Sequence, residues 1–177
     1  MNDVGASATE AVDFFIEAVE QIPSESWDLP SNLEGWSIRD LVAHSTGSMA
    51  KIVTLVEGGQ VAQGPADPND WRSENPAAQL RALAGRLHSA LPSADLDALR
   101  QAVTTPVVGL TVHAWDVYRS QHRPVELPDD LLAFCRQVES VPEEELRRPG
   151  VFGPAQPAPE DATPTARLMA YLGRSVV

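Results

Sequence analysis

Hydrophobic residues recur at helical spacing in several stretches of this chain, and prolines separate those stretches. Proline is tolerated in the first turn of a helix but breaks its interior. The proline-free windows are therefore the expected helices, with a further short helix after Pro164. The windows are 1–22, 31–64, 77–91, 107–123 and 129–141. This pattern predicts an all-α bundle of four or five helices.

The first two windows carry the clearest amphipathic pattern and recognisable helix ends. Apolar residues in each form one stripe, and charged residues take the other side. Ser7 and Glu10 have the spacing of a capping box, which predicts a helix start at Ser7. Ser37 and Asp40 repeat this spacing in the second window, and the pair Gly58-Gly59 is expected to end that helix.

The later windows are less uniform. Asn75-Pro76 is expected to start the third helix, and Pro128-Asp129 the fifth. The fourth window, 107–123, begins with β-branched residues that locally favour a strand, but its length favours a helix. Segments 60–74 and 141–164 are rich in Pro, Gly and Asp, so both are expected to be loops. We expect the second to pack across the helices as an extended arm.

The length of 177 residues fits one domain, with the bundle over about 4–141 and the arm over about 142–177. With 13 Lys+Arg against 25 Asp+Glu, the net charge is −12. This charge argues against binding to nucleic acid or an anionic membrane, because phosphate contacts need clustered Lys and Arg. The chain shows neither a signal-peptide pattern nor an apolar run of membrane-spanning length. We therefore expect a cytoplasmic protein with no nucleic-acid or membrane partner.

The single cysteine, Cys135, limits the possible chemistry. One cysteine forms no intramolecular disulfide and no cysteine-based zinc cluster. Cys135 falls at an inward position of its window, where a cysteine behaves as a small hydrophobic residue. Any thiol chemistry would therefore need a thiol supplied by a small molecule.

Two of the four histidines stand out as candidates for a functional site. His88 has no neighbour in the sequence that could share a metal with it, and His122 lies near the C-terminus of its helix, where the helix dipole favours a histidine. We therefore interpret both as structural or exposed residues. His44 lies at the flank of its helix's apolar stripe, and His113 lies three residues before Asp116 on one face of the fourth helix. Histidines from two helices that point into one gap can build a metal site in a bundle. The alternative is a pair of hydrogen-bonded core histidines.

Three stretches resemble one known family. Trp36-Ser-Ile-Arg-Asp-Leu-Val-Ala-His44 resembles the first metal-ligand motif of the DinB-like superfamily. More narrowly, it resembles the mycothiol-dependent maleylpyruvate isomerase N-terminal family, whose second motif resembles Val112-His-Ala-Trp-Asp116. The tail, with Arg148-Pro-Gly-Val-Phe-Gly-Pro, Asp161-Ala and Arg167-Leu-Met-Ala-Tyr-Leu-Gly-Arg174, resembles the C-terminal signature of a single-domain actinobacterial branch.

The resemblance implies a DinB-like four-helix bundle, often dimeric, that acts on a small-molecule substrate. It also implies a divalent metal such as zinc or nickel, held by a His on the second helix and a Glu-x-x-x-His pair on a later helix. These positions correspond to His44 and His113. In the members that use mycothiol, this thiol adds to an electrophile and the outcome is isomerisation or S-transfer. The metal would favour the thiolate, which is the nucleophile.

The sequence departs from this pattern at one ligand position. The Glu is expected four residues before His113, where this chain has Gly109, a residue with no side chain to coordinate a metal. Asp116 supplies the missing carboxylate in one interpretation. In a second, His44 and His113 bind the metal with water or an unplaced acid. In a third, the metal is lost, and the pocket binds a ligand or uses His113 in acid–base chemistry.

The leading functional hypothesis is a mycothiol-type isomerase or S-transferase-like protein with an altered divalent-metal site. The alternative is a metal-free, non-catalytic small-molecule binding protein on the same bundle, and a third hypothesis is an interaction subunit with an acidic surface. A homodimer is possible in each case. At a length of 177 residues we expect no counterpart of the C-terminal domain of the longer isomerases, and so we do not expect the full maleylpyruvate reaction.

Two further groups of residues invite a functional or a structural interpretation. Trp36, Trp71 and Trp115 could line a substrate crevice, or could serve as packing residues. Arg167 and Arg174 could bind an acidic substrate, or could pair with acids of this acidic chain.

Overall fold

The structure is a computed structural model that describes residues 3–148 and 150–177. Among these residues the regular structure is helical, and no strand occurs apart from an isolated bridge between Pro30 and Ser37. The expected all-α fold class is therefore confirmed. The chain divides into two compact units, Met1–Val125 and Glu126–Val177.

Four long helices of the first unit form a closed ring of contacts. Helix α1 packs on α4 and α5, and α2 packs on the same two helices. The four are α1 (Val4–Glu20), α2 (Ile38–Val56), α4 (Pro76–Ala90) and α5 (Leu96–Ser120). Large buried side chains from all four fill the centre, among them Phe15, Met49, Leu80 and Leu110. This arrangement is the expected four-helix bundle.

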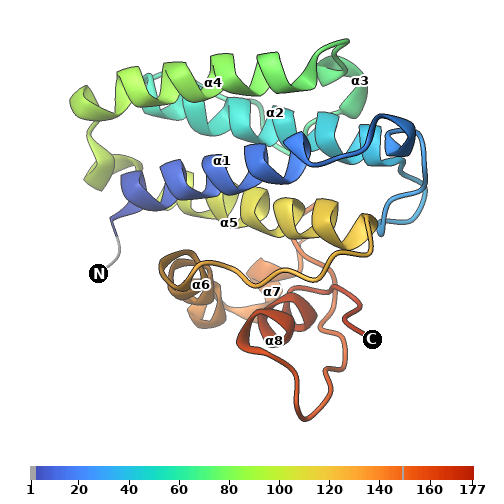
Figure 1. Cartoon of the computed structure of the whole chain (residues 1–177). Helices are drawn as coiled ribbons and strands as arrows, with labels where there is room; N and C mark the ends of the chain where they lie inside the picture. Colours follow the sequence, from blue (N-terminus) through green and yellow to red (C-terminus); the bar gives the residue numbers. More distant parts are fainter. Residues whose placement is uncertain (1–2, 149) are drawn as a thin grey trace. The chain divides into compact units, whose positions relative to one another are not determined.

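The direction of the helices requires one long connection. Figure 1 shows that α1 and α5 run in one direction and that α2 and α4 run in the other. Because α2 and α4 are parallel, the chain must travel back along the bundle between Val56 and Pro76. We expected a loop over 60–74, and the connection also holds the short helix α3 (Pro68–Trp71), which packs on α2.

Two predicted helix starts are confirmed. The side chain of Ser37 accepts a hydrogen bond from the N–H of Asp40, and the Asp40 carboxylate accepts one from the N–H of Ser37. This reciprocal capping box begins α2 as the sequence indicates. Helix α4 begins with Pro76 after an Asn75 cap. Helix α2 ends at Val56, and Gly58 follows with a φ of 81°, in the left-handed region that glycine favours.

The predicted start of the first helix is wrong. Helix α1 begins at Val4, where the side chain of Asp3 accepts a hydrogen bond from the N–H of Gly5. Ser7 is buried in the next turn, and its own N–H donates to the carbonyl of Asp3. An aspartate cap earlier in the chain thus takes the position that the Ser7–Glu10 spacing suggested. Residues 1–2 of the first window lie outside the described residues.

The rule that proline ends a helix fails at Pro106. The fourth window was expected to begin at residue 107, but α5 runs from Leu96 to Ser120 with Pro106 in its interior. Pro106 lacks the N–H that would bond the carbonyl of Ala102. Ala102 is exposed, so water can serve that carbonyl, and Asp95 caps the helix by accepting from the N–H of Ala98. Both features make this interior proline tolerable.

Among its described residues the second unit contains three short α-helices, α6 (Asp129–Cys135), α7 (Glu143–Leu146) and α8 (Pro164–Tyr171), and a 3-10 helix at Arg136–Ser140. Residues 126–141, which were expected in the bundle, belong by their contacts to this unit, and the bounds of the bundle and of the arm stay predictions. That both units form one domain stays a prediction. Pro149, part of the tail motif, lies outside the described residues.

One arginine organises the segment before α8. The guanidinium of Arg147 donates to the carbonyl of Gly153 at 2.6 Å and to that of Tyr171 at 2.9 Å. It also lies over the Tyr171 ring, 5.0 Å from the ring centroid. Arg147 therefore attaches the segment expected as a loop, 141–164, to α8, and this segment also contains the short helix α7 that we had not expected.

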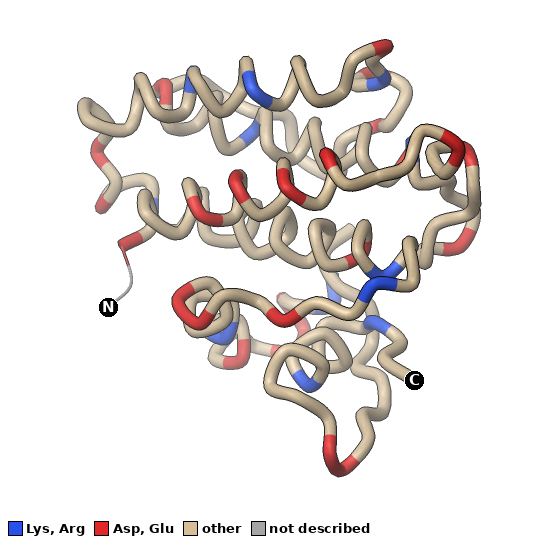
Figure 2. Tube along the Cα trace, in the orientation of Figure 1, with Lys and Arg blue, Asp and Glu red and all other residues tan. Residues whose placement is uncertain are grey.

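The exposed face of α1 is acidic. Figure 2 shows acidic positions along α1, where Asp13, Glu17 and Glu20 are exposed. Among the described helices, none combines the length and the apolar character that a membrane span requires.

A Gly85→Ala variant tests whether α4 is a continuous surface helix. A Cβ at Gly85 would meet no atom within 4 Å, and alanine favours a helix interior over glycine by ~1 kcal/mol. We expect the free energy of unfolding to rise by roughly 0.5–1 kcal/mol, measured by urea denaturation followed by circular dichroism. A clear loss of stability would show that Gly85 needs a conformation that alanine cannot adopt.

Candidate functional site

The structure brings His44 of α2 and His113 of α5 together. Their Nε2 atoms lie 3.2 Å apart, and the two rings are perpendicular with centroids 4.8 Å apart. His44 is 7% exposed, and the His113 side chain is 15% exposed. Two of the predicted site residues, which are far apart in sequence, therefore form one partly accessible pair.

The outer side of His44 is held by the connection between α2 and α4. The Nδ1–H of His44 donates to the carbonyl of Ala66 at 2.7 Å. Because a carbonyl only accepts, this contact places the hydrogen on Nδ1. Trp36 covers the ring, with centroids 4.8 Å apart. His44 thus presents Nε2, rather than Nδ1, to His113.

The outer side of His113 is held by a buried carboxylate. Nδ1 of His113 lies 3.2 Å from Oδ2 of Asp116, whose side chain is fully buried. Oδ1 of the same carboxylate accepts a hydrogen bond from the Nδ2–H of Asn32 at 2.8 Å. The hydroxyl of Ser120 donates to the backbone carbonyl of Asp116 and accepts from the N–H of Asn32. Asp116 therefore contacts the His113 nitrogen that faces away from His44.

These contacts determine what can lie between the two rings. With Asp116 ionised, Nδ1 of His113 carries a hydrogen, as Nδ1 of His44 does. Two neutral rings in this state would place two unprotonated Nε2 atoms 3.2 Å apart, where their lone pairs repel each other. A single cation between the two nitrogens, either a proton or a metal ion, replaces this repulsion with attraction.

The pair fits a zinc-like divalent ion as two of its ligands. With metal–nitrogen bonds of about 2.0–2.1 Å, an Nε2–Nε2 separation of 3.2 Å subtends about 100°, close to a tetrahedral angle. The Nδ1–H groups donate to a carbonyl and a carboxylate, as the outer nitrogens of metal-binding histidines usually do. Among the described residues, however, no group of three or more His, Cys, Asp or Glu is placed to hold a metal.

The position expected to hold the third ligand has open space. A Cβ built at Gly109, one turn before His113 on α5, would meet no atom within 4 Å. Packing therefore does not require glycine here, and a side chain could be accommodated. The missing carboxylate is a property of the sequence rather than a consequence of crowding in the bundle.

The start of α2 beside the site carries an ion pair. Burial alone would raise the pKa of Asp40, but hydrogen bonds from Ser37 and Arg72 together outweigh it and hold that pKa below its usual value. Asp40 is therefore ionised at neutral pH, and its pairing with Arg72 attaches the end of the α2–α4 connection to the first turn of α2.

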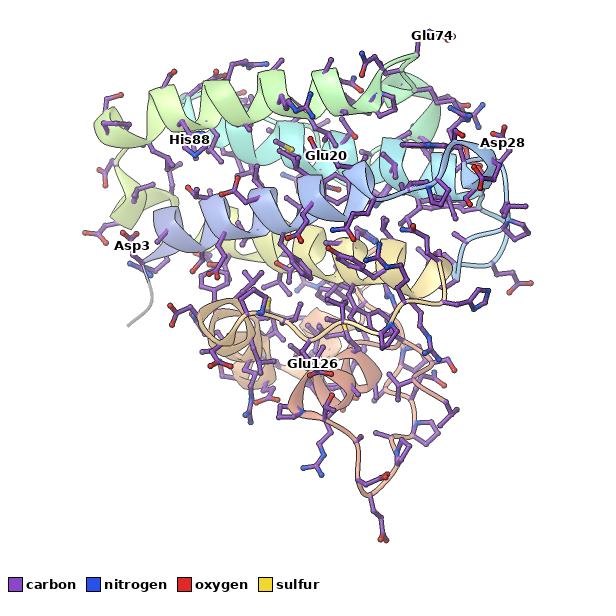
Figure 3. The ribbon with its side chains drawn as sticks, viewed as in Figure 1. Asp3, Glu20, Asp28, Glu74, His88 and Glu126 are labelled. Atoms are coloured by element: carbon purple, nitrogen blue, oxygen red, sulfur yellow. The ribbon has the colours of Figure 1, made fainter. Side chains whose placement is uncertain are left out.

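The other candidate residues lie apart from this pair. His88 is exposed near the C-terminal end of α4, as Figure 3 shows, and His122 is exposed after α5. Trp115 is buried at 7% exposure, consistent with packing. In the second unit, Arg167 and Arg174 donate to the backbone carbonyls of Glu160 and Leu172.

Trp71 and Cys135 have packing roles in the structure. The indole of Trp71 lies against Gly47 on α2, one turn after His44. Cys135 is fully buried, as its sequence pattern indicates.

Three contributors to the site were not identified from the sequence. Asn32 and Ser120 hold Asp116, and Ala66 holds His44 through its backbone carbonyl. Ser120 lies one turn after Asp116 on the same face of α5, a spacing that could have indicated it. Every residue has a carbonyl, so no sequence signal marks Ala66.

The fold and the site define an all-α bundle that carries a facing histidine pair from two neighbouring helices. Comparison with protein-family models matches residues 8–121 to the mycothiol maleylpyruvate isomerase N-terminal domain. The match covers α2, α4, α5 and both histidines. The chain belongs to this family, and the family implies the DinB-like superfamily. Comparisons with curated proteins and with solved structures gave no match.

An Asp116→Asn variant tests whether the carboxylate sets the tautomer of His113. The amide NH₂ would donate to Nδ1, so the ring hydrogen should move to Nε2, which can then donate to Nε2 of His44. We expect the Nδ1–H form of His113 to change from the major to the minor tautomer. Long-range ¹H–¹⁵N correlation spectra, assigned with a His113→Ala variant, would measure this change.

Asp13→Asn is the matched control, because Asp13 is exposed on α1. It should leave the His113 signals unchanged. An unaltered tautomer in Asp116→Asn itself would show that another group orients the ring.

Proposed function

We propose that this protein is a mycothiol-type, thiol-dependent isomerase or S-transferase-like enzyme in which His44 and His113 hold a divalent metal. The observation that carries the proposal is the pair of Nε2 atoms, which face each other at 3.2 Å with both outer nitrogens already engaged. Membership of the family supports the thiol, and the pair supports the metal. The substrate class is a small electrophilic molecule.

The residues around the pair have distinct tasks in this proposal. His44 and His113 provide the two nitrogen ligands, and Ala66 and Asp116 keep those nitrogens unprotonated and directed inward. A bound divalent metal would lower the pKa of a coordinated thiol, so that the nucleophilic thiolate forms at neutral pH. Trp36 packs against the His44 ring.

Two features define how the site would be used. Cys135 is fully buried, so the reacting thiol must come from a small molecule, for which mycothiol is the candidate that the family suggests. Gly109 offers no third protein ligand, which leaves coordination positions to the thiol and to water. In this proposal Asp116 acts by orienting His113, rather than as a ligand.

A metal-free binding protein is the second candidate, and the absence of a third ligand at Gly109 is the observation that favours it. In that case the two rings would share a proton, and the pocket would bind a small molecule without a metal. Once the shared proton has left, the free Nε2 of His113 could accept a proton from a bound ligand as a general base. A homodimer also remains a prediction, which light scattering coupled to size exclusion would test.

Metal content gives the primary test. After reconstitution with Zn²⁺ and removal of loosely bound ions, we expect about one zinc per chain in the wild type and in His88→Ala, whose histidine lies on exposed α4 surface. The double variant His44→Ala/His113→Ala should retain none, because both nitrogen ligands are lost. Elemental analysis measures the result.

The thiol is tested on the same samples loaded with Co²⁺. Mycothiol should produce a thiolate-to-cobalt absorption band in the wild type and in His88→Ala, but not in the double variant. Absence of bound metal after reconstitution would reject the metalloenzyme and favour the binding protein. Metal binding without a thiol band would reject the thiol-dependent function alone.

A Gly109→Glu variant is expected to strengthen metal binding. The new carboxylate lies one turn before His113 and enters open space, so it can complete a three-ligand site. We expect a rise of at least about tenfold in Zn²⁺ affinity, measured by competition with a chromogenic chelator.

Gly109→Gln has nearly the same shape without the charge, and Gly109→Ala controls for helix propensity. Both should bind Zn²⁺ within a few-fold of the wild type. Equal affinities for Glu and Gln at this position would mean that residue 109 does not reach the metal.

A further inference from the structure

One face of α2 makes four successive contacts with the returning connection. Asp40, His44, Gly47 and Lys51 are separated by four, three and four residues, which places them in a row along one side of a helix. We call residues 64–72 the covering segment. It runs back along this row because the parallel directions of α2 and α4 require the chain to return.

Polar attachments hold both ends of the covering segment. At one end, Nζ of Lys51 donates to the carbonyl of Gly64. At the other end, Arg72 forms an ion pair with Asp40. Between them, the carbonyl of Ala66 accepts the Nδ1–H of His44 at 2.7 Å. The hydrogen bond that fixes the tautomer of His44 is therefore part of a longer docked interface.

At Gly47 the segment comes close to the helix backbone. A Cβ at Gly47 would lie 2.7 Å from both Cδ1 and Nε1 of Trp71, and closer still to the Cβ of Ala66. Real Cβ atoms essentially never show contacts this short. Because a Cβ is fixed to its backbone, any side chain at Gly47 would push the backbone of Ala66 away from α2.

We propose that Gly47 is a positioning residue for His44, because its missing side chain lets the covering segment place the Ala66 carbonyl on Nδ1. The segment thereby selects Nε2 as the nitrogen that His44 directs at His113. A displaced carbonyl would let the His44 ring exchange tautomers and turn. The inference deepens the proposed function, since His44 is one of the two proposed ligands.

The test compares Gly47→Ala with Gly85→Ala in the metal-free protein. Both substitutions add the same methyl group to a helix, but Gly85 has open space and Gly47 has none. Long-range ¹H–¹⁵N spectra of the imidazole rings, assigned with a His44→Ala variant, report the tautomer. We expect one Nδ1–H form of His44 in the wild type and in Gly85→Ala, and a mixture with a major share of the Nε2–H form in Gly47→Ala.

Lys51→Met removes one attachment of the segment without adding atoms to the interface. It should change His44 in the same direction and by a smaller amount, so it decides the matter if Gly47→Ala fails to fold. In zinc titrations, Gly47→Ala should bind about tenfold more weakly than Gly85→Ala, the effect expected when a ligand loses its outer hydrogen-bond partner.

The inference is overturned if His44 in folded Gly47→Ala keeps the wild-type Nδ1–H form, or if Nδ1 of His44 carries no hydrogen in the wild type itself. These results are independent of metal. If no variant binds zinc, the proposed function fails while the ring spectra still decide the role of Gly47.

Discussion

The approach of two imidazole Nε2 atoms to 3.2 Å is the constraint on which the site depends. Each ring is fixed from outside, His44 by the Ala66 carbonyl and His113 by the Asp116 carboxylate. These contacts leave the two Nε2 atoms facing each other, and the proposed cation lies between them. Two buried Nε2 atoms that both lacked a hydrogen-bond partner would destabilise the fold. A positive ion between them would satisfy both nitrogens and remove this cost.

The bundle imposes this approach through its topology. Helices α2 and α5 are neighbours in the ring of four, so His44 and His113 can meet although they are distant in sequence. Because α2 and α4 run in the same direction, the connection between them returns along α2 and brings Ala66 to His44. Most of the site is therefore set by helix packing and by one crossover, rather than by a local loop motif.

Helical periodicity, the caps at Ser37 and Asn75, and the pairing of the two histidines could be predicted from the sequence. The rules for where a helix begins failed at two places. Asp3 replaces the expected cap at Ser7, and α5 continues through Pro106, beside exposed Ala102. Neither outcome contradicts the amphipathic pattern, which concerns the buried faces of helices rather than their ends.

The supporting contacts of the site could not be predicted in the same way. Asn32 reaches Asp116 from a distant loop, and Ala66 acts through a backbone carbonyl. In the sequence Gly47 is simply a glycine within a helix, and the positions of Ala66 and Trp71 show why a larger residue would not fit. Such roles depend on which surfaces meet, and that information appears only with tertiary structure.

X-ray absorption spectroscopy at the zinc edge of the reconstituted protein tests the central claim most directly, because it counts the imidazoles around the metal. We expect the outer-shell scattering of two imidazole rings around the zinc. Further oxygen or nitrogen ligands, such as water, should complete the first coordination shell. In the presence of the thiol, one sulfur should join the two rings. Zinc coordinated without imidazole, or by a single ring, would contradict the account of a cation shared between His44 and His113.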